Sequence, residues 1–160
     1  MKKVTFRTKI NPGDEVTIRE MITSTGFFYE IEVEVAVELA QEKLQMGAKS
    51  TYQFIFAERE GETMAYSCYG HIAGTESSFD LYWIVTHNDF RGHGIGRLLL
   101  EETHRQIKDQ GGNNVVAETS SLEKYQPTRN FYKKMGYHES GFIPDFYKEE
   151  DGKLTFVKKL

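Results

Sequence analysis

Three glycines at alternate positions, Gly92, Gly94 and Gly96, are the residues of this chain whose spacing most clearly allows chemistry. Glycine has no Cβ, so the backbone N–H groups of this stretch are not shielded by side chains, and a helix-forming segment follows at once. The first N–H groups of a helix have no acceptor within the helix and attract phosphate. The pattern therefore predicts a phosphate-binding corner, with an ordinary tight strand-to-helix turn as the alternative.

Such a corner needs a strand before it and a helix behind it. Residues 81–85 form an apolar run that is too short to span a membrane and rich in β-branched and aromatic side chains, so they predict a buried strand. Helix-forming residues follow the glycines as far as Gly111 and Gly112. No Gly-Lys-Ser/Thr ends the loop, as a P-loop requires, and Gly96 comes one residue too early for the dinucleotide pattern G-x-G-x-x-G.

Residues 91–96 resemble the Arg/Gln-x-x-Gly-x-Gly/Ala signature of the GCN5-related N-acetyltransferase (GNAT) family, which also lies between an apolar strand and a helix. Residues 129–137 resemble a second motif of that family, FY-x-x-x-GF, with Tyr137 in place of the commoner phenylalanine. Two motifs in the expected order are more specific than either alone. The resemblance spans essentially the whole chain, although residues 1–50 match only in pattern.

The resemblance implies an acetyl-coenzyme A-dependent N-acetyltransferase that moves an acetyl group directly to a primary amine in a ternary complex. In the family the glycine loop holds the pyrophosphate of acetyl-coenzyme A. The end of the preceding strand pairs with the pantetheine arm and donates to the thioester carbonyl. The cofactor-binding residues implied here are Ile84, Val85, Thr86, Arg91, Gly92, His93, Gly94, Ile95, Gly96 and Arg97. A plain core strand would explain the side chains at the strand end equally well.

Two side chains match catalytic positions of family members. Tyr132 matches the family tyrosine that protonates the departing coenzyme A thiolate, although an aromatic residue at helical spacing is usually part of a core. Glu118 follows Val116 on what we expect to be the same strand face, so an acid would share a surface with a core residue, and some members use a glutamate at about this place as a base. A salt bridge or a substrate-positioning contact is the alternative for Glu118. The asparagine that many members carry seven residues before the tyrosine is Tyr125 here.

Two other functions fit the same residues. One is transfer of a longer acyl group or transfer to another nucleophile, and the other is a non-catalytic domain that binds or senses acyl-coenzyme A. The presence of both Glu118 and Tyr132 favours an enzyme. We expect a small-molecule or peptide amine as acceptor. Antibiotics, polyamines, amino acids, peptide N-termini and protein lysines all remain open, because acceptor pockets are built from variable loops and helices.

Composition predicts a single domain over residues 1–160. A chain of 160 residues with 39% hydrophobic and 28% charged residues is typical of a globular protein that can bury a sizeable core. The net charge of −4 argues against a nucleic-acid partner. Cys68, the sole cysteine, excludes an internal disulfide and suits a reducing cytosol, and no apolar run is long enough for a membrane span, so we expect a cytoplasmic protein.

The five histidines lack metal-ligand spacing, so no metal is predicted, while a homodimer is possible because dimers are common in the family. The fold class predicted is α+β, a mixed and mostly antiparallel central sheet flanked by helices, as in the acyl-coenzyme A N-acyltransferase fold. Strands are predicted at residues 4–8, 52–56, 64–68, 81–85, 114–120, 141–147 and 153–160.

A first helix is predicted to start at Asn11 as cap and Pro12 as first residue and to end at Gly26, and a short late helix lies between Pro127 and Gly136. Residues 28–39 alternate as a strand would, but apolar side chains also recur four residues apart. The helical continuation towards Gly47 and the family resemblance favour a helix there. A parallel strand–helix–strand unit is expected around the glycine corner, and a closing hairpin turns at residues 151–152.

Overall fold

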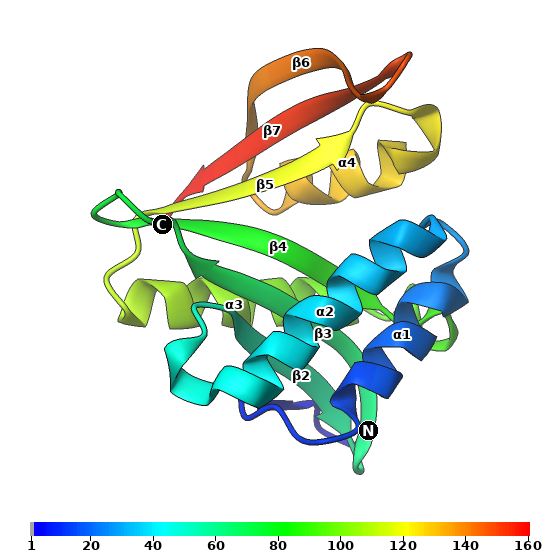
Figure 1. The fold of residues 1–160 in the computed structure, drawn as a ribbon, viewed down its shortest axis with the longest axis vertical. Helices are drawn as coiled ribbons and strands as arrows, with labels where there is room; N and C mark the ends of the chain where they lie inside the picture. Colours follow the sequence, from blue (N-terminus) through cyan, green and yellow to red (C-terminus); the bar gives the residue numbers. More distant parts are fainter. Residues whose placement is uncertain (1) are drawn as a thin grey trace. The chain divides into compact units, whose positions relative to one another are not determined.

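A computed structural model describes residues 2–160, which form an α+β fold with four α-helices and a mostly antiparallel set of seven strands, as predicted (Figure 1). The helices are α1 (Asp14–Thr25), α2 (Glu30–Met46), α3 (Ile95–Asp109) and α4 (Gln126–Lys134). The strands are β1 (Thr5–Arg7), β2 (Gln53–Arg59), β3 (Glu62–His71), β4 (Ser78–Thr86), β5 (Asn114–Ser120), β6 (His138–Lys148) and β7 (Asp151–Lys159). Short 3₁₀ turns are η1 (Gly47–Lys49), η2 (Asn88–Phe90) and η3 (Glu123–Tyr125).

The chain forms two compact units. The first unit consists of the chain up to Gly70 together with Trp83–Thr103, and the second of His71–Tyr82 with His104–Leu160. Strand β4 and helix α3 each pass from one unit into the other, because the boundaries fall inside them. The single domain predicted for residues 1–160 stays a prediction. No helix in residues 2–160 is long and apolar enough to cross a membrane.

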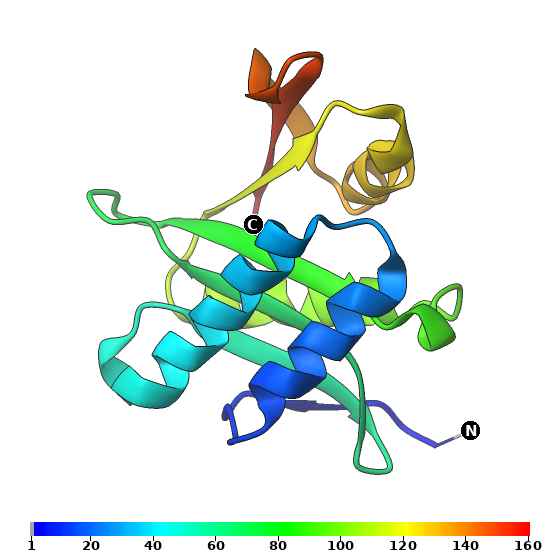
Figure 2. The same cartoon turned by 45° about the vertical axis from the view of Figure 1, so that its right-hand side comes forward.

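In the first unit, α1 and α2 lie side by side on one face of β2 and β3, which pair as the predicted antiparallel hairpin (Figures 1 and 2). The α2 residues that enter the core are Val33, Ala36, Val37 and Ala40, at helical spacing. Ile31 and Val35, which made the sequence look like a strand, are exposed by 71% and 43%. On the other face, the Ser67 hydroxyl of β3 bonds that of Thr103 in α3 at 2.8 Å.

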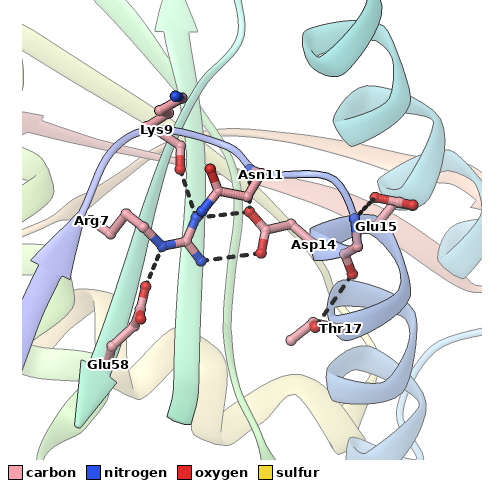
Figure 3. A network of polar contacts seen from close by, with 8 residues as sticks. Arg7, Lys9, Asn11, Asp14, Glu15, Thr17 and Glu58 are labelled. Carbon is pink, nitrogen blue, oxygen red and sulfur yellow. Dashed lines mark hydrogen bonds and ion pairs between the residues drawn. The ribbon is translucent and has the colours of Figure 1, made fainter. Parts of the chain in front are cut away.

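Helix α1 begins later than predicted. Its N-cap is Gly13 rather than Asn11, and its first helical residue is Asp14 rather than Pro12. The cause lies outside the segment: the Arg7 guanidinium of β1 donates to both Asp14 carboxylate oxygens, at 2.8 and 3.1 Å, and to Glu58 of β2 (Figure 3). The Asn11 N–H also donates to Asp14, at 2.7 Å, so Asn11 is a donor to the helix start and not its cap. The predicted end at Gly26 is confirmed.

In the second unit the strand order is β4-β5-β7-β6. Strand β4 pairs with β5 in parallel, with Phe79 opposite Val115. This pairing confirms the parallel strand–helix–strand arrangement predicted around the glycine corner. The β6–β7 hairpin is also confirmed, but Asp151 and Gly152 are the buried first residues of β7 and not a polar turn, because the chain turns at residues 149–150 instead. Asp151 is held there by the Ser120 hydroxyl of β5.

Candidate active site

The glycine corner lies between a strand and a helix, as its sequence predicts. Strand β4 ends at Thr86, η2 follows, and α3 begins at Ile95 directly after Gly94. Gly92 and Gly94 have φ of 81° and 77°, in the left-handed region that side chains disfavour. A Cβ at either position would meet nothing within 4 Å, so it is the backbone, and not crowding, that requires glycine there. Gly96 lies in the first turn of α3.

The groups of this corner that can bind a ligand are mainly backbone N–H groups. The first bond into α3 runs from the Leu98 N–H to the Gly94 carbonyl at 3.2 Å, so the N–H groups before Leu98 precede the helical ladder and carry the positive end of the helix dipole. Among the predicted side chains, His93 is exposed, and Arg97 forms an ion pair with Glu101 at 2.9 Å. A phosphate group bound there would compete with Glu101 for Arg97.

The last turn of α1 and the segment after it contact the loop that contains the corner. The Asn88 N–H donates to the Ser24 hydroxyl at 3.0 Å, and the Arg91 guanidinium lies 5.4 Å from the centre of the Phe27 ring. A cation held on an aromatic face is oriented before any anion arrives. Sequence reasoning missed Ser24 and Phe27, since a contact between residues so far apart in the chain leaves no local pattern.

The end of β4 divides its side chains between core and surface. Val85 is buried in the core beneath α1 and α2, while Ile84 and Thr86 are half-buried. Trp83 packs edge-on against Phe28 with ring centres 5.3 Å apart. The side chain of Val85 therefore belongs to the hydrophobic core, as the alternative interpretation of this strand expected. Pairing of the strand backbone with the pantetheine arm stays a prediction.

A cavity of about 310 Å³ opens in the first unit beside the start of the corner. Three carboxylates line it, Glu20 of α1, Glu62 of β3 and Asp89 of η2, together with His87. None of the predicted site residues is part of its wall. Among residues 2–160, no cluster of three or more His, Cys, Asp and Glu side chains has the arrangement of a metal site.

Tyr132 lies in the second unit, in the helix α4 where its motif placed it. It is buried, with its ring 5.2 Å from that of Tyr137 and 5.9 Å from that of Phe156 in β7. Tyr132 is therefore part of the hydrophobic core of the second unit, as is usual for an aromatic residue at helical spacing. Burial raises the pKa of the Tyr132 phenol above its ordinary value, so the hydroxyl stays protonated at neutral pH.

Glu118, also in the second unit, does not share a face with a core residue, contrary to expectation. The buried face of β5 carries Val115 and Ala117, while Val116 is only half-buried and Glu118 is exposed. The alternation therefore runs one residue out of step with the prediction. The Lys153 ammonium donates to the Glu118 carboxylate at 3.4 Å, which is the salt bridge foreseen as the alternative.

Asp80 is a candidate that sequence reasoning missed. In the parallel register Asp80 pairs with Val116, so its side chain lies on the sheet face that also carries Glu118. Burial raises the pKa of the Asp80 carboxyl, the negative charge of Glu118 raises it further, and a hydrogen bond from Tyr82 lowers it. An acid inside the apolar run of residues 79–85 was the available signal.

The first unit brings its predicted residues together, whereas the second unit carries its two predicted residues on opposite faces of the strands. The first unit gathers the strand end and the glycine corner, residues 84–86 and 91–97. In the second unit the Tyr132 ring packs on Phe156, which pairs with the buried Ala117, so Tyr132 lies on the face of β5 and β7 opposite to the face that carries Glu118.

Comparison with known proteins identifies the family. Residues 50–139 match the model of the acetyltransferase (GNAT) domain. A GNAT-family protein of Desulfovibrio desulfuricans is 36% identical, with 98% of this chain and 99% of that chain covered and a TM-score of 0.93. A segment of 52 residues is 38% identical to Elongator complex protein 3 of Danio rerio, but it covers 32% of this chain and 9% of that protein.

Two more distant structures share the fold. The ribosomal-protein-alanine N-acetyltransferase of Brucella melitensis is 21% identical, with 98% and 99% of the two chains covered and a TM-score of 0.78. An aminoglycoside 6'-N-acetyltransferase, solved in complex with coenzyme A, is 15% identical, with 98% and 96% covered and a TM-score of 0.76. The chain therefore belongs to the GNAT family of acetyltransferases.

Proposed function

We propose that this protein transfers the acetyl group of acetyl-coenzyme A directly to a primary amine in a ternary complex. The observation that carries the proposal is the corner between β4 and α3, where Gly92 and Gly94 adopt left-handed conformations in front of unpaired helix N–H groups. Arg91, held over Phe27, adds a cation beside it. This is an arrangement suited to a pyrophosphate.

Acetyl transfer requires the amine to lose a proton and the departing thiolate to gain one. The amine nitrogen attacks the thioester carbonyl carbon, the carbon–sulfur bond breaks, and the amine loses a proton while the thiolate gains one. We assign the proton gained by the thiolate to Tyr132, whose burial keeps its hydroxyl protonated. The backbone of residues 84–86 would donate to the carbonyl oxygen as its negative charge develops.

The amine must be neutral before it attacks, and a primary amine with a pKa of about 10 is mostly protonated at neutral pH. The face of β4 and β5 that carries Asp80 and Glu118 supplies two carboxylates that attract an ammonium group. We take Asp80 as the base, because burial and the charge of Glu118 raise its pKa above the ordinary value, whereas Glu118 is paired with Lys153. We therefore add Asp80 to the predicted catalytic residues as a second carboxylate on the face of Glu118, while Tyr132 packs on the opposite face against Phe156.

The acceptor class we propose is a small-molecule or peptide amine. Two structures of the same fold are named for aminoglycosides and for the alanine of a ribosomal protein, which supports testing both kinds of amine. Cys68 is buried and free, which agrees with the cytoplasmic location we propose.

The test is thiol release from acetyl-coenzyme A over a panel of aminoglycosides, polyamines, amino acids and peptides with free N-termini. We expect at least one amine to raise thiol release well above the hydrolysis background, with an equal amount of acetylated product found by mass spectrometry. Tight acetyl-coenzyme A binding without turnover on any amine would favour the non-catalytic sensor. Faster turnover of longer acyl thioesters would favour the other alternative.

A further inference from the structure

One buried cation in the second unit connects the strand that carries Glu118 to the helix that carries Tyr132. Arg129 is only 8% exposed. One guanidinium nitrogen donates to the Ser120 carbonyl at 2.6 Å and to the Leu122 carbonyl at 2.9 Å, and the other donates to the Gln126 side chain at 3.0 Å. Ser120 is the last residue of β5, and Gln126 is the first of α4.

The start of α4 lacks the usual side-chain cap. Its N-cap, Tyr125, makes no side-chain capping bond, and its first turn contains no acidic residue. The far end of the helix is held separately, by Lys158 of β7, which donates to the Met135 carbonyl at 2.6 Å. The Arg129 contacts, which join the end of β5 to the first residue of α4, therefore help to set the direction in which α4 leaves β5.

Arg129 and Tyr132 are three residues apart on α4, which puts them on neighbouring turns of the same side of the helix. A shift of the helix start consequently moves the phenol, whose position against Phe156 sets where its hydroxyl lies. The proton donor of a reaction must be within hydrogen-bond reach of the atom it protonates, so a small displacement costs rate without removing the donor.

We propose that Arg129 is a positioning residue, which holds α4 on the end of β5 so that the Tyr132 hydroxyl meets the departing thiolate. The inference rests on the proposed role of Tyr132. The positioning role also requires an arginine at residue 129, because only a planar guanidinium donates to Ser120, Leu122 and Gln126 at the same time. A lysine keeps the charge, but its three N–H groups lie on one nitrogen and cannot replace donors on two separate guanidinium nitrogens, so the start of α4 is held less firmly.

A double-mutant cycle with R129K and Y132F tests this, using an amine from the panel and conditions in which chemistry limits kcat. Y132F is expected to lower kcat by at least about tenfold. R129K should lower kcat by about tenfold when Tyr132 is present and by less than about twofold when it is combined with Y132F. The KM for acetyl-coenzyme A should change by less than about twofold, since the loop residues are untouched.

The matched control is R105K, the same change at an exposed arginine that pairs with Asp109 in α3. It should leave kcat unchanged. Melting temperatures of all variants, measured alongside, ensure that the rates compare folded proteins. If R129K is too unstable to assay, Q126A removes one of the acceptors of Arg129 and should give a smaller loss that again disappears in the presence of Y132F.

The outcomes separate the two ideas. An equal loss from R129K with and without Y132F would mean that Arg129 acts on general stability, and it would overturn the positioning role while leaving Tyr132 as the acid. Full activity of Y132F would instead remove Tyr132 from the proposed mechanism and the positioning role of Arg129 with it.

Discussion

Burial raises the pKa of both Tyr132 and Asp80, and the two shifts serve opposite tasks. The Tyr132 phenol becomes a weaker acid than the ordinary value near about 10 implies. A thiolate formed beside it would lose water as well, which raises the pKa of the thiol and keeps the proton transfer feasible. The Asp80 carboxyl becomes a stronger base, which favours proton uptake from an amine.

The stability effect of Asp80 is predicted to depend on pH. A carboxyl whose pKa is raised in the folded state favours folding below its unfolded pKa of about 4, and this contribution is lost as the pH rises through the folded pKa. Asp80→Asn should therefore leave the melting temperature unchanged at pH 3 and raise it by about 1–3 °C at pH 7. The exposed Asp109, paired with Arg105, is the control, and Asp109→Asn should give no gain at pH 7. A gain from Asp80→Asn at pH 3 as large as at pH 7 would contradict the argument.

The rates should distinguish the two carboxylates. Asp80→Asn is expected to lower kcat/KM at neutral pH by about tenfold or more, with a smaller loss at high pH, where the amine deprotonates unaided. Glu118→Gln should cost less, and it should move the acidic limb of the pH–rate profile to lower pH, because the Glu118 charge is one cause of the raised Asp80 pKa. Full pH–rate profiles of both variants are the measurement. An unmoved acidic limb in Glu118→Gln, or a uniform loss across pH in Asp80→Asn, would leave both groups as positioning contacts.

Single residues were predictable from the sequence only where a motif carried them. Gly92 and Gly94 could be found because the conformation they need is local and glycine alone adopts it readily. Asp80 could not be linked to Glu118, since their proximity depends on the register of two strands joined through α3, which no local pattern encodes. Val116 was placed in the core because the alternation of β5 was assigned one residue out of step.

At the scale of helices and strands, the sequence predicted some boundaries correctly, and contacts with residues far away in the chain determined the others. Residues 114–120 were predicted as β5 with its true ends, because turn residues flank an apolar strand. The start of α1 was misplaced because Arg7 and Glu58, from two strands, determine where Asp14 lies (Figure 3). For α2 the alternating pattern was ambiguous until the packing of Val33 and Val37 decided it.

The corner between β4 and α3 gives a prediction at this scale. Gly94→Val forces a β-branched side chain into a left-handed conformation, which should cost about 1–3 kcal/mol of stability and, because the loop then shifts, weaken coenzyme A binding by at least about tenfold. Gly74 is the matched control: its φ is 82° and a Cβ there would also meet nothing within 4 Å. Gly74→Val should cost similar stability with unchanged affinity by calorimetry. Equal affinity in folded Gly94→Val would mean that the corner does not hold the cofactor.

For the whole molecule, the path of the chain bears on the predicted single domain. Both β4 and α3 belong partly to the first unit and partly to the second, so unfolding of either unit breaks elements of the other. We therefore expect one cooperative unfolding transition. Trp83, the sole tryptophan, reports on the first unit by fluorescence, and hydrogen exchange of the β5 and β7 amides reports on the second.

Two substitutions, one in each unit, test whether the two units unfold together. Arg7→Met removes the partner of the buried Asp14 in the first unit, and Phe156→Ala opens the core of the second unit, each at a cost of about 2–5 kcal/mol. In a single domain each change lowers the urea midpoint by the same amount for the fluorescence and the exchange probe, because either unit is stable only with the other. If Phe156→Ala lowered the midpoint of the β5 and β7 amides and left that of Trp83 in place, the two units would be separate folding domains.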